Sequence, residues 1–284
     1  FSLFKRVFRS GLTFVPNSLS GLLGLALNAW LLNRMASSAA LGTYAVAVLF
    51  PQLMQIPYNS LISAAYPTLA KLMGDGGKEA RRQQSRLYTL LITGNVGIAL
   101  GVALFVPIAI KILTDPSYHE AARVAPILVV AWLLLGLSVI VGQTVFVVGG
   151  GLWLSAATVT SVIVNVALCL ALIPRYGIYG AAWAMLGGFA ARLVVSAGVS
   201  CYLYRLPWEV TRILRAIGCA GALAIADRWL SPGLSLAGAI ALKTALLTAM
   251  LPALWGLGVV STAECKRARD VIFGKVRAWR GRNR

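Results

Sequence analysis

The sequence contains few acidic residues and a single histidine. Asp and Glu together number 8 among 284 residues, and all charged residues make up only 12% of the chain. A soluble domain contains about 25% charged residues, so this composition excludes an ordinary soluble protein. The histidine, His119, lies near Asp115 and Glu120, and one histidine beside an acid is thin support for general acid–base catalysis. We therefore predict that the chain is not an enzyme.

Several chemical motifs are also missing. The sequence has no Gly-Lys-Ser/Thr phosphate-binding loop, which excludes a P-loop ATPase. Its four cysteines share no metal-binding or redox spacing, and no His, Cys or carboxylate cluster offers a metal site. We predict neither a metal nor another cofactor.

Long apolar runs dominate what is present. Hydrophobic residues make up 59% of the chain, and its mean hydropathy is +0.80. An apolar run of 18 or more residues is typical of a transmembrane helix. We predict an all-α polytopic membrane protein with eight such spans, over residues 12–35, 44–70, 87–113, 125–148, 152–173, 178–204, 213–230 and 234–260.

The positive charges indicate the orientation of these spans. Of the 26 Lys and Arg residues, 19 fall on the side that holds both termini, whereas five fall on the other side. The positive-inside rule places the first side in the cytoplasm. The net charge of +18 therefore reflects membrane topology, and we expect the basic tail to lie against membrane lipids rather than nucleic acid.

The spans divide into a larger and a smaller group. We predict a six-helix lobe over residues 1–206, two additional helices over 207–260 and a basic cytoplasmic tail over 261–284. The longest internal polar connection, 71–86, contains a Gly-Asp-Gly-Gly turn signal. Three prolines, at positions 51, 57 and 67, predict a kink in the second span.

Polar residues follow helical spacing in several spans, so that each set shares one face of its helix. Such faces serve helix–helix packing or line an aqueous cavity, and the spacing alone leaves both open. The two faces that carry amides are the cavity candidates: Gln52, Gln55, Asn59 and Ser63 in the second span, and Ser155, Thr158, Ser161 and Asn165 in the fifth.

Arg192 lies near the middle of the sixth span, about 21 Å along a helix that begins at residue 178. Gly188, Ser196 and Ser200 share its face. All eight acids lie in connections, near span ends or in the tail, so we expect none to pair with Arg192. A charge at this depth costs at least about 2.5–3.5 kcal/mol. Its partner is therefore water, backbone carbonyls, another chain or an anionic ligand.

Two further cations complete the set of candidate binding residues. Lys243 lies about ten residues into the last span, where its stem could bring the charge toward the surface. Arg34 closes the first span on the outer side, at a place typical of an interfacial anchor. Either residue could also contact an anionic substrate.

Three stretches carry a family resemblance. They are "SSAALGTYAVAVLFPQLMQIPYNSLISAAYPTLAKL" (37–72), "ILTDPSYHEAARVAPILVVAW" (112–132) and "NVALCLALIPRYGIYGAAWAMLGG" (165–188). Together they resemble the polysaccharide transporter, or oligosaccharide flippase, family of the multidrug/oligosaccharidyl-lipid/polysaccharide exporter superfamily. The chain departs from the family at Asn33-Arg34, where relatives often carry an acid before the basic residue.

The resemblance implies a function and a location. Members of the family move undecaprenyl-diphosphate-linked glycans across the bacterial inner membrane by alternating access, in a fold with two six-helix lobes. This chain would correspond to the second lobe and an added helix pair, and its partners would be the lipid-linked glycan and glycan-assembly membrane proteins. Three alternatives remain: a multidrug or peptidoglycan-precursor exporter, a non-transporting partner subunit, and a membrane enzyme acting through Asp115, His119, Glu120 or Asp227.

Overall fold

The computed structural model describes residues 26–75, 77–204, 208–231 and 235–259, and every regular element within them is helical. The chain divides into two compact units, Phe1–Trp208 and Glu209–Arg284. Six helices in the described part are long and apolar enough to cross a membrane. The chain is therefore a multi-pass helical membrane protein by its composition and helix lengths.

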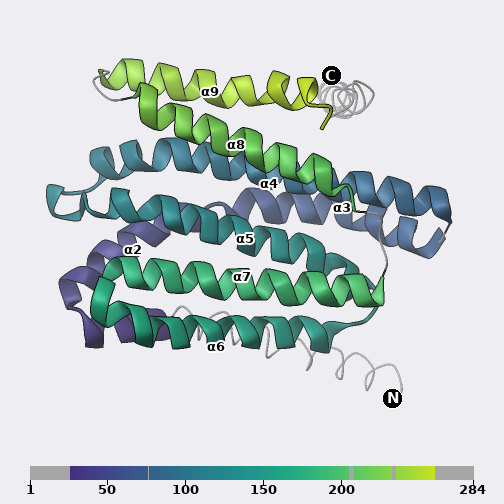
Figure 1. Cartoon of the computed structure of the whole chain (residues 1–284), viewed down its shortest axis with the longest axis horizontal. Coiled ribbons are helices and arrows are strands. Elements are labelled where there is room, and N and C mark those ends of the chain that lie inside the picture. Colours follow the sequence, from purple (N-terminus) through teal and green to yellow (C-terminus); the bar gives the residue numbers. More distant parts are fainter. Residues whose placement is uncertain (1–25, 76, 205–207, 232–234, 260–284) are drawn as a thin grey trace, which may run out of the picture. The chain divides into compact units, whose positions relative to one another are not determined.

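Unit 1 contains α2 to α7. In chain order they are α2 Ser38–Gln52, α3 Gln55–Asp75, α4 Lys78–Leu113, a short helix η1 Pro116–Tyr118, α5 Ala121–Val147, α6 Gly151–Tyr176 and α7 Ile178–Leu203. Residues 26–35 form a further helical segment at the edge of the described part. Figure 1 shows α5 between α4 and α7, with α6 packed along the other side of α7.

The core of unit 1 is centred on α5. Trp132 is almost fully buried there, and its ring meets that of Phe189 on α7 edge-on, with centroids 5.7 Å apart. By contrast, large apolar side chains such as Leu152 and Val194 are about 70% exposed. An apolar surface of this kind matches lipid better than water.

The second predicted span bends more sharply than a kink. It divides into α2 and α3 at Leu53 and Met54, which form a turn. Proline at position 57 has no N–H to donate to the carbonyl of Leu53, and its ring would clash with that carbonyl in a continuous helix. The amides of Leu53 and Met54 instead donate to carbonyls three residues earlier, at Phe50 and Pro51.

The polar connection predicted over 71–86 is mostly helical. α3 continues to Asp75 and α4 begins at Lys78, so the two helices cover all but two residues of this connection. This segment is rich in good helix formers, namely Lys, Glu, Ala, Arg and Gln. Hydropathy does not measure that helix preference. α4 has 36 residues, or about 54 Å, against a hydrocarbon core of about 30 Å, so it is long enough to extend beyond that core.

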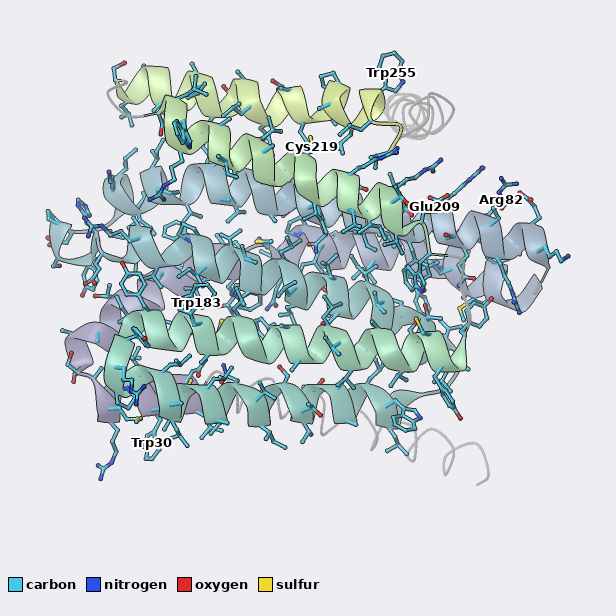
Figure 2. The ribbon with its side chains drawn as sticks, in the orientation of Figure 1. Trp30, Arg82, Trp183, Glu209, Cys219 and Trp255 are labelled. Atoms are coloured by element: carbon cyan, nitrogen blue, oxygen red, sulfur yellow. The ribbon has the colours of Figure 1, made fainter. Side chains whose placement is uncertain are left out.

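The two ends of unit 1 differ in their side chains. Figure 2 shows Arg82 projecting from the first turns of α4, whereas Trp30 and Trp183 lie at the opposite end. Both tryptophans are more than half exposed, as expected for residues at a membrane interface. α6 and α7 join there through Gly177, whose φ of 54° favours glycine, and through Gly180, whose missing side chain leaves space for the Leu172 carbonyl.

Unit 2 is a helical hairpin of α8 Val210–Leu230 and α9 Leu236–Gly256. α9 is one of the six apolar helices, but α8, predicted as the seventh span, is not among them. It carries two arginines near its start and Asp227-Arg228 near its end. The first predicted span lies mostly outside the described residues, as does the predicted tail over 261–284.

Candidate functional site

Arg192 lines a cavity inside unit 1. Its helix, α7, places Gly188, Ser196 and Ser200 on the same face, and all three are buried. The cavity has a volume of about 220 Å³ and lies among α5, α6 and α7. Its lining consists of Ser138, Val139, Gly142, Gln143 and Phe146 from α5, Leu154 from α6, and Arg192 and Ser196 from α7.

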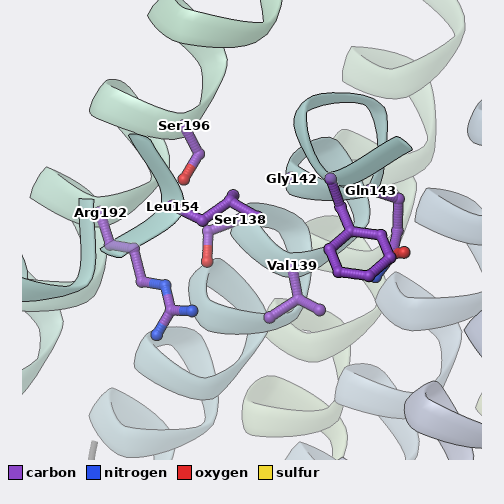
Figure 3. Close-up of a pocket in the computed structure, with 8 residues that line it drawn as sticks. Ser138, Val139, Gly142, Gln143, Leu154, Arg192 and Ser196 are labelled. Carbon is purple, nitrogen blue, oxygen red and sulfur yellow. The ribbon is translucent and has the colours of Figure 1, made fainter. Parts of the chain in front are cut away.

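The surroundings of the guanidinium are small or polar on the α5 side. Figure 3 shows the side chains of Arg192, Ser196 and Ser138 facing the same space. The Ser138 hydroxyl donates to the Leu135 carbonyl at 2.7 Å, which leaves its lone pairs available. Gly142 allows close approach, since a Cβ at that position would lie 2.9 Å from a methyl group of Leu154.

The Arg192 charge has no carboxylate partner in the described part of the chain. The ion pairs found there are Arg212–Glu209 and Lys243–Asp227, both within unit 2. The phenol of Tyr58 on α3 lies close enough to interact with the Arg192 charge, but a protonated phenol carries no charge of its own. A guanidinium in this position can bind an anion in a bidentate manner.

The polar face of the fifth span forms a helix interface rather than the wall of an open path. Ser155, Thr158, Ser161 and Asn165 on α6 are all buried. A Cβ at Gly188 of α7 would lie 2.8 Å from the Asn165 Cβ and 2.9 Å from the Ser161 carbonyl oxygen, so the two helices touch here. The Asn165 Oδ1 has no hydrogen-bond partner in the described residues. Of the two interpretations left open by the spacing, packing describes this face.

The polar face of the second span has the opposite environment. On α3, Asn59 and Ser63 are exposed and Gln55 is partly exposed, whereas Tyr58 and Ile62 are buried against the rest of unit 1. A membrane helix that presents amides outward needs water or another protein against them, because lipid cannot satisfy them.

The other two predicted cations are not brought to Arg192. Arg34 is exposed near the end of the helical segment over 26–35. Lys243 belongs to unit 2, is 5% exposed, and donates to the Asp227 Oδ2 at 2.6 Å. Its charge is thus neutralised by Asp227 near the end of α8, and its part in substrate binding stays a prediction.

Two of the acids suggested for an enzyme, Asp115 and Asp227, form contacts within the chain. Asp115 accepts hydrogen bonds from the Ser117 amide at 3.1 Å and the Ser117 hydroxyl at 3.0 Å, which caps the short helix η1. These bonds hold the pKa of the Asp115 carboxyl below its ordinary value. Asp227 is engaged by Lys243.

Sequence reasoning missed Tyr58, Ser138 and Gln143. The last two lie in the most apolar of the predicted spans, where an isolated polar residue is a signal for an interior position. Tyr58 lies next to the predicted face of the second span, and its side chain turns inward.

No protein-family model, curated protein or solved structure matches the chain. The fold and the site therefore rest on the sequence and structure described above.

Proposed function

We propose that the chain belongs to a transporter that moves a lipid-linked oligosaccharide across the bacterial inner membrane by alternating access. Arg192 binds the diphosphate headgroup inside the bundle, and the exposed face of α3 borders the hydrated path for the sugars. The observation that supports this proposal best is an arginine in the middle of a membrane helix, beside a polar cavity and without a carboxylate partner in the described residues.

The energetics favour an anionic ligand over an empty site. Holding Arg192 in the membrane costs at least about 2.5–3.5 kcal/mol, and phosphate oxygens offset that cost through charge-assisted hydrogen bonds. The cavity of about 220 Å³ is smaller than the 300–1,000 Å³ of a pocket for a drug-sized ligand. It therefore suits the phosphates, while the glycan lies outside it.

The test is transport by purified chain in proteoliposomes loaded with a diphosphate-linked oligosaccharide lipid. A membrane-impermeant phosphatase reports how much headgroup has crossed. We expect Arg192→Gln and Arg192→Leu to reduce the rate at least tenfold. Arg192→Lys should retain part of it, because lysine keeps the charge but loses bidentate geometry. Arg175→Gln, which removes an exposed arginine at the end of α6, is the matched control, and unchanged transport in both Arg192 variants would refute the cargo role.

The exposed amides of α3 also favour a second candidate, a subunit whose α3 packs against another membrane protein. Cysteines placed at Asn59 and at buried Ile62, in a background without other cysteines, separate the two candidates. A hydrated path predicts that a water-soluble maleimide labels position 59 at least tenfold faster than position 62. Protection of position 59 in native membranes, lost after mild detergent extraction, would favour the subunit instead.

A further inference from the structure

A second polar cluster lies at the end of unit 1 opposite Trp30 and Trp183. It is built on the first turns of α4 and on the last turns of α7. Arg81, Gln84 and Tyr88 share a face of α4. Ser200 lies in the last turn of α7, and Tyr204 follows the end of that helix in an extended conformation. The positive-inside rule assigns this end to the cytoplasmic side.

Contacts between helices hold the cluster together. The Arg81 guanidinium lies 5.5 Å from the centre of the Tyr204 ring, in a cation–π arrangement. The hydroxyls of Tyr88 and of Thr144 on α5 form a hydrogen bond of 2.7 Å. The Tyr88 ring also lies against that of Trp208, with centroids 5.5 Å apart.

Three members of the cluster have unsatisfied polar atoms. Gln84 is 0% exposed; its amide interacts with the Tyr88 hydroxyl, but neither amide atom has a partner at full hydrogen-bond geometry in the described residues. The hydroxyl of Ser200, which is also 0% exposed, and the buried hydroxyl of Tyr204 likewise have no hydrogen-bond partner there. Native proteins leave few such groups. Several side by side, next to an arginine, indicate a place prepared for a polar ligand.

The donors in the cluster match an anion. Arg81 supplies a guanidinium, Gln84 an amide NH₂, and Ser200 and Tyr204 supply hydroxyls that can donate. Phosphate oxygens accept from all four groups, and the guanidinium provides the charge-assisted bonds. The amide oxygen of Gln84 is left for a hydroxyl of the same headgroup or for water.

We propose that Arg81, Gln84, Ser200 and Tyr204 form a second anion subsite, which holds the phosphates of a lipid-linked headgroup at the cytoplasmic end of the bundle. The identity of the lipid rests on the proposed function, whereas the subsite itself does not. Along α7, Ser196 and Ser200 continue from Arg192 toward Tyr204 in steps of four residues. Ser200 of the second subsite is thus about 12 Å along the helix from Arg192, with the Ser196 hydroxyl between them.

The test uses the full chain in nanodiscs and the fluorescence of Trp208, titrated with farnesyl diphosphate, farnesol and inorganic pyrophosphate. We expect saturable quenching by farnesyl diphosphate, none by farnesol, and at least tenfold weaker binding of pyrophosphate. Trp208→Phe should abolish the signal while a ligand-induced rise in melting temperature remains. Pyrophosphate that binds as tightly as farnesyl diphosphate would overturn the lipid headgroup as ligand, and no saturable signal would overturn the subsite.

Neighbouring residues on α4 provide matched controls. Arg81→Gln should weaken binding at least tenfold and Arg82→Gln less than twofold, since both arginines are exposed but only Arg81 reaches Tyr204. Gln84→Leu should weaken binding at least fivefold, and Gln83→Leu, on the exposed side of the same turn, should not. Because Gln84→Leu removes unsatisfied polar atoms, it should keep or raise the melting temperature without ligand. Equal losses in Arg81→Gln and Arg82→Gln would mean diffuse charge attraction and overturn the proposal.

The outcome is separable from the transport test. A Trp208 signal that depends on Arg81, together with transport that ignores Arg192, would retain the subsite and refute the proposed function. Transport that requires Arg192, without any saturable Trp208 signal, would retain the function and refute the subsite.

Discussion

The ion pair between Lys243 and Asp227 gives a quantitative prediction about unit 2. The side chains are 6% and 14% exposed, and the Nζ–Oδ2 distance is 2.6 Å. Breaking one side of a buried pair leaves an uncompensated charge and costs about 3–5 kcal/mol. We therefore expect Lys243→Met or Asp227→Leu alone to destabilise the α8–α9 hairpin by about that amount.

The double variant should behave differently from the sum of its parts. With both charges replaced by apolar residues, the hairpin should lie within about 2 kcal/mol of the natural sequence, because apolar replacements of a buried pair are often neutral. The pair between Arg212 and Glu209 is the internal control. Its side chains are 34% and 24% exposed, so Glu209→Gln should cost under about 1 kcal/mol.

The assay is reversible unfolding of the purified chain by SDS in bicelles. Unfolding is monitored by energy transfer between two dyes, one at the start of α8 and one at the end of α9. A double-mutant cycle isolates the coupling between Lys243 and Asp227. Single variants that cost less than about 1 kcal/mol, or costs that simply add in the double variant, would refute the reasoning. The lysine would then find water in the folded hairpin.

Two further predictions concern unit 1. Gly188→Ala should destabilise the α6–α7 pair by about 1–3 kcal/mol, because its Cβ would lie 2.9 Å from the Ser161 carbonyl oxygen. Gly198→Ala should not destabilise it, because the space around Gly198 is open. The same SDS unfolding assay compares the two variants. The Asp115 carboxyl should titrate below its ordinary pKa of about 3.9, and Ser117→Ala should raise that pKa, as followed by carbon NMR. Because the folded pKa is lowered, the stabilisation by Asp115 is present above about pH 4 and is lost as the pH falls through the lowered pKa. An Asp115 pKa unmoved by Ser117→Ala would contradict the assigned hydrogen bonds.

Hydropathy predicted where apolar helices occur but not where helices end. The break at Leu53 follows from proline at position 57, although three prolines in one predicted span gave no way to choose among them. The long polar start of α4 was not predicted as part of a helix, because the prediction relied on apolar residues alone. Its residues form helix readily but are too polar to count toward a span.

The environment of Arg192 could be predicted only along its own helix. Steps of four residues identified Ser196 and Ser200 correctly as its buried neighbours on α7. Ser138 and Gln143 come from α5, and no spacing within one helix reveals which faces of two helices will meet. The same limit explains the pair between Lys243 and Asp227. Counting acids by their position relative to span ends placed Asp227 near a surface, whereas the hairpin packs its side chain against α9.

The buried polar atoms of Gln84, Ser200 and Tyr204 reduce the stability of the folded chain. Each buried polar atom without a partner costs about 1–3 kcal/mol, so packing alone would favour apolar residues at these positions. Placing the Arg192 charge inside the membrane also costs free energy, and Arg192 has no carboxylate partner in the described residues. Local rules of stability are commonly violated at functional sites. Here Arg192 and Ser200 share one face of α7, Tyr204 follows the end of that helix, and Gln84 lies on α4. This arrangement, rather than any single residue, is the reason for our proposal that an anion moves between Arg81 and Arg192.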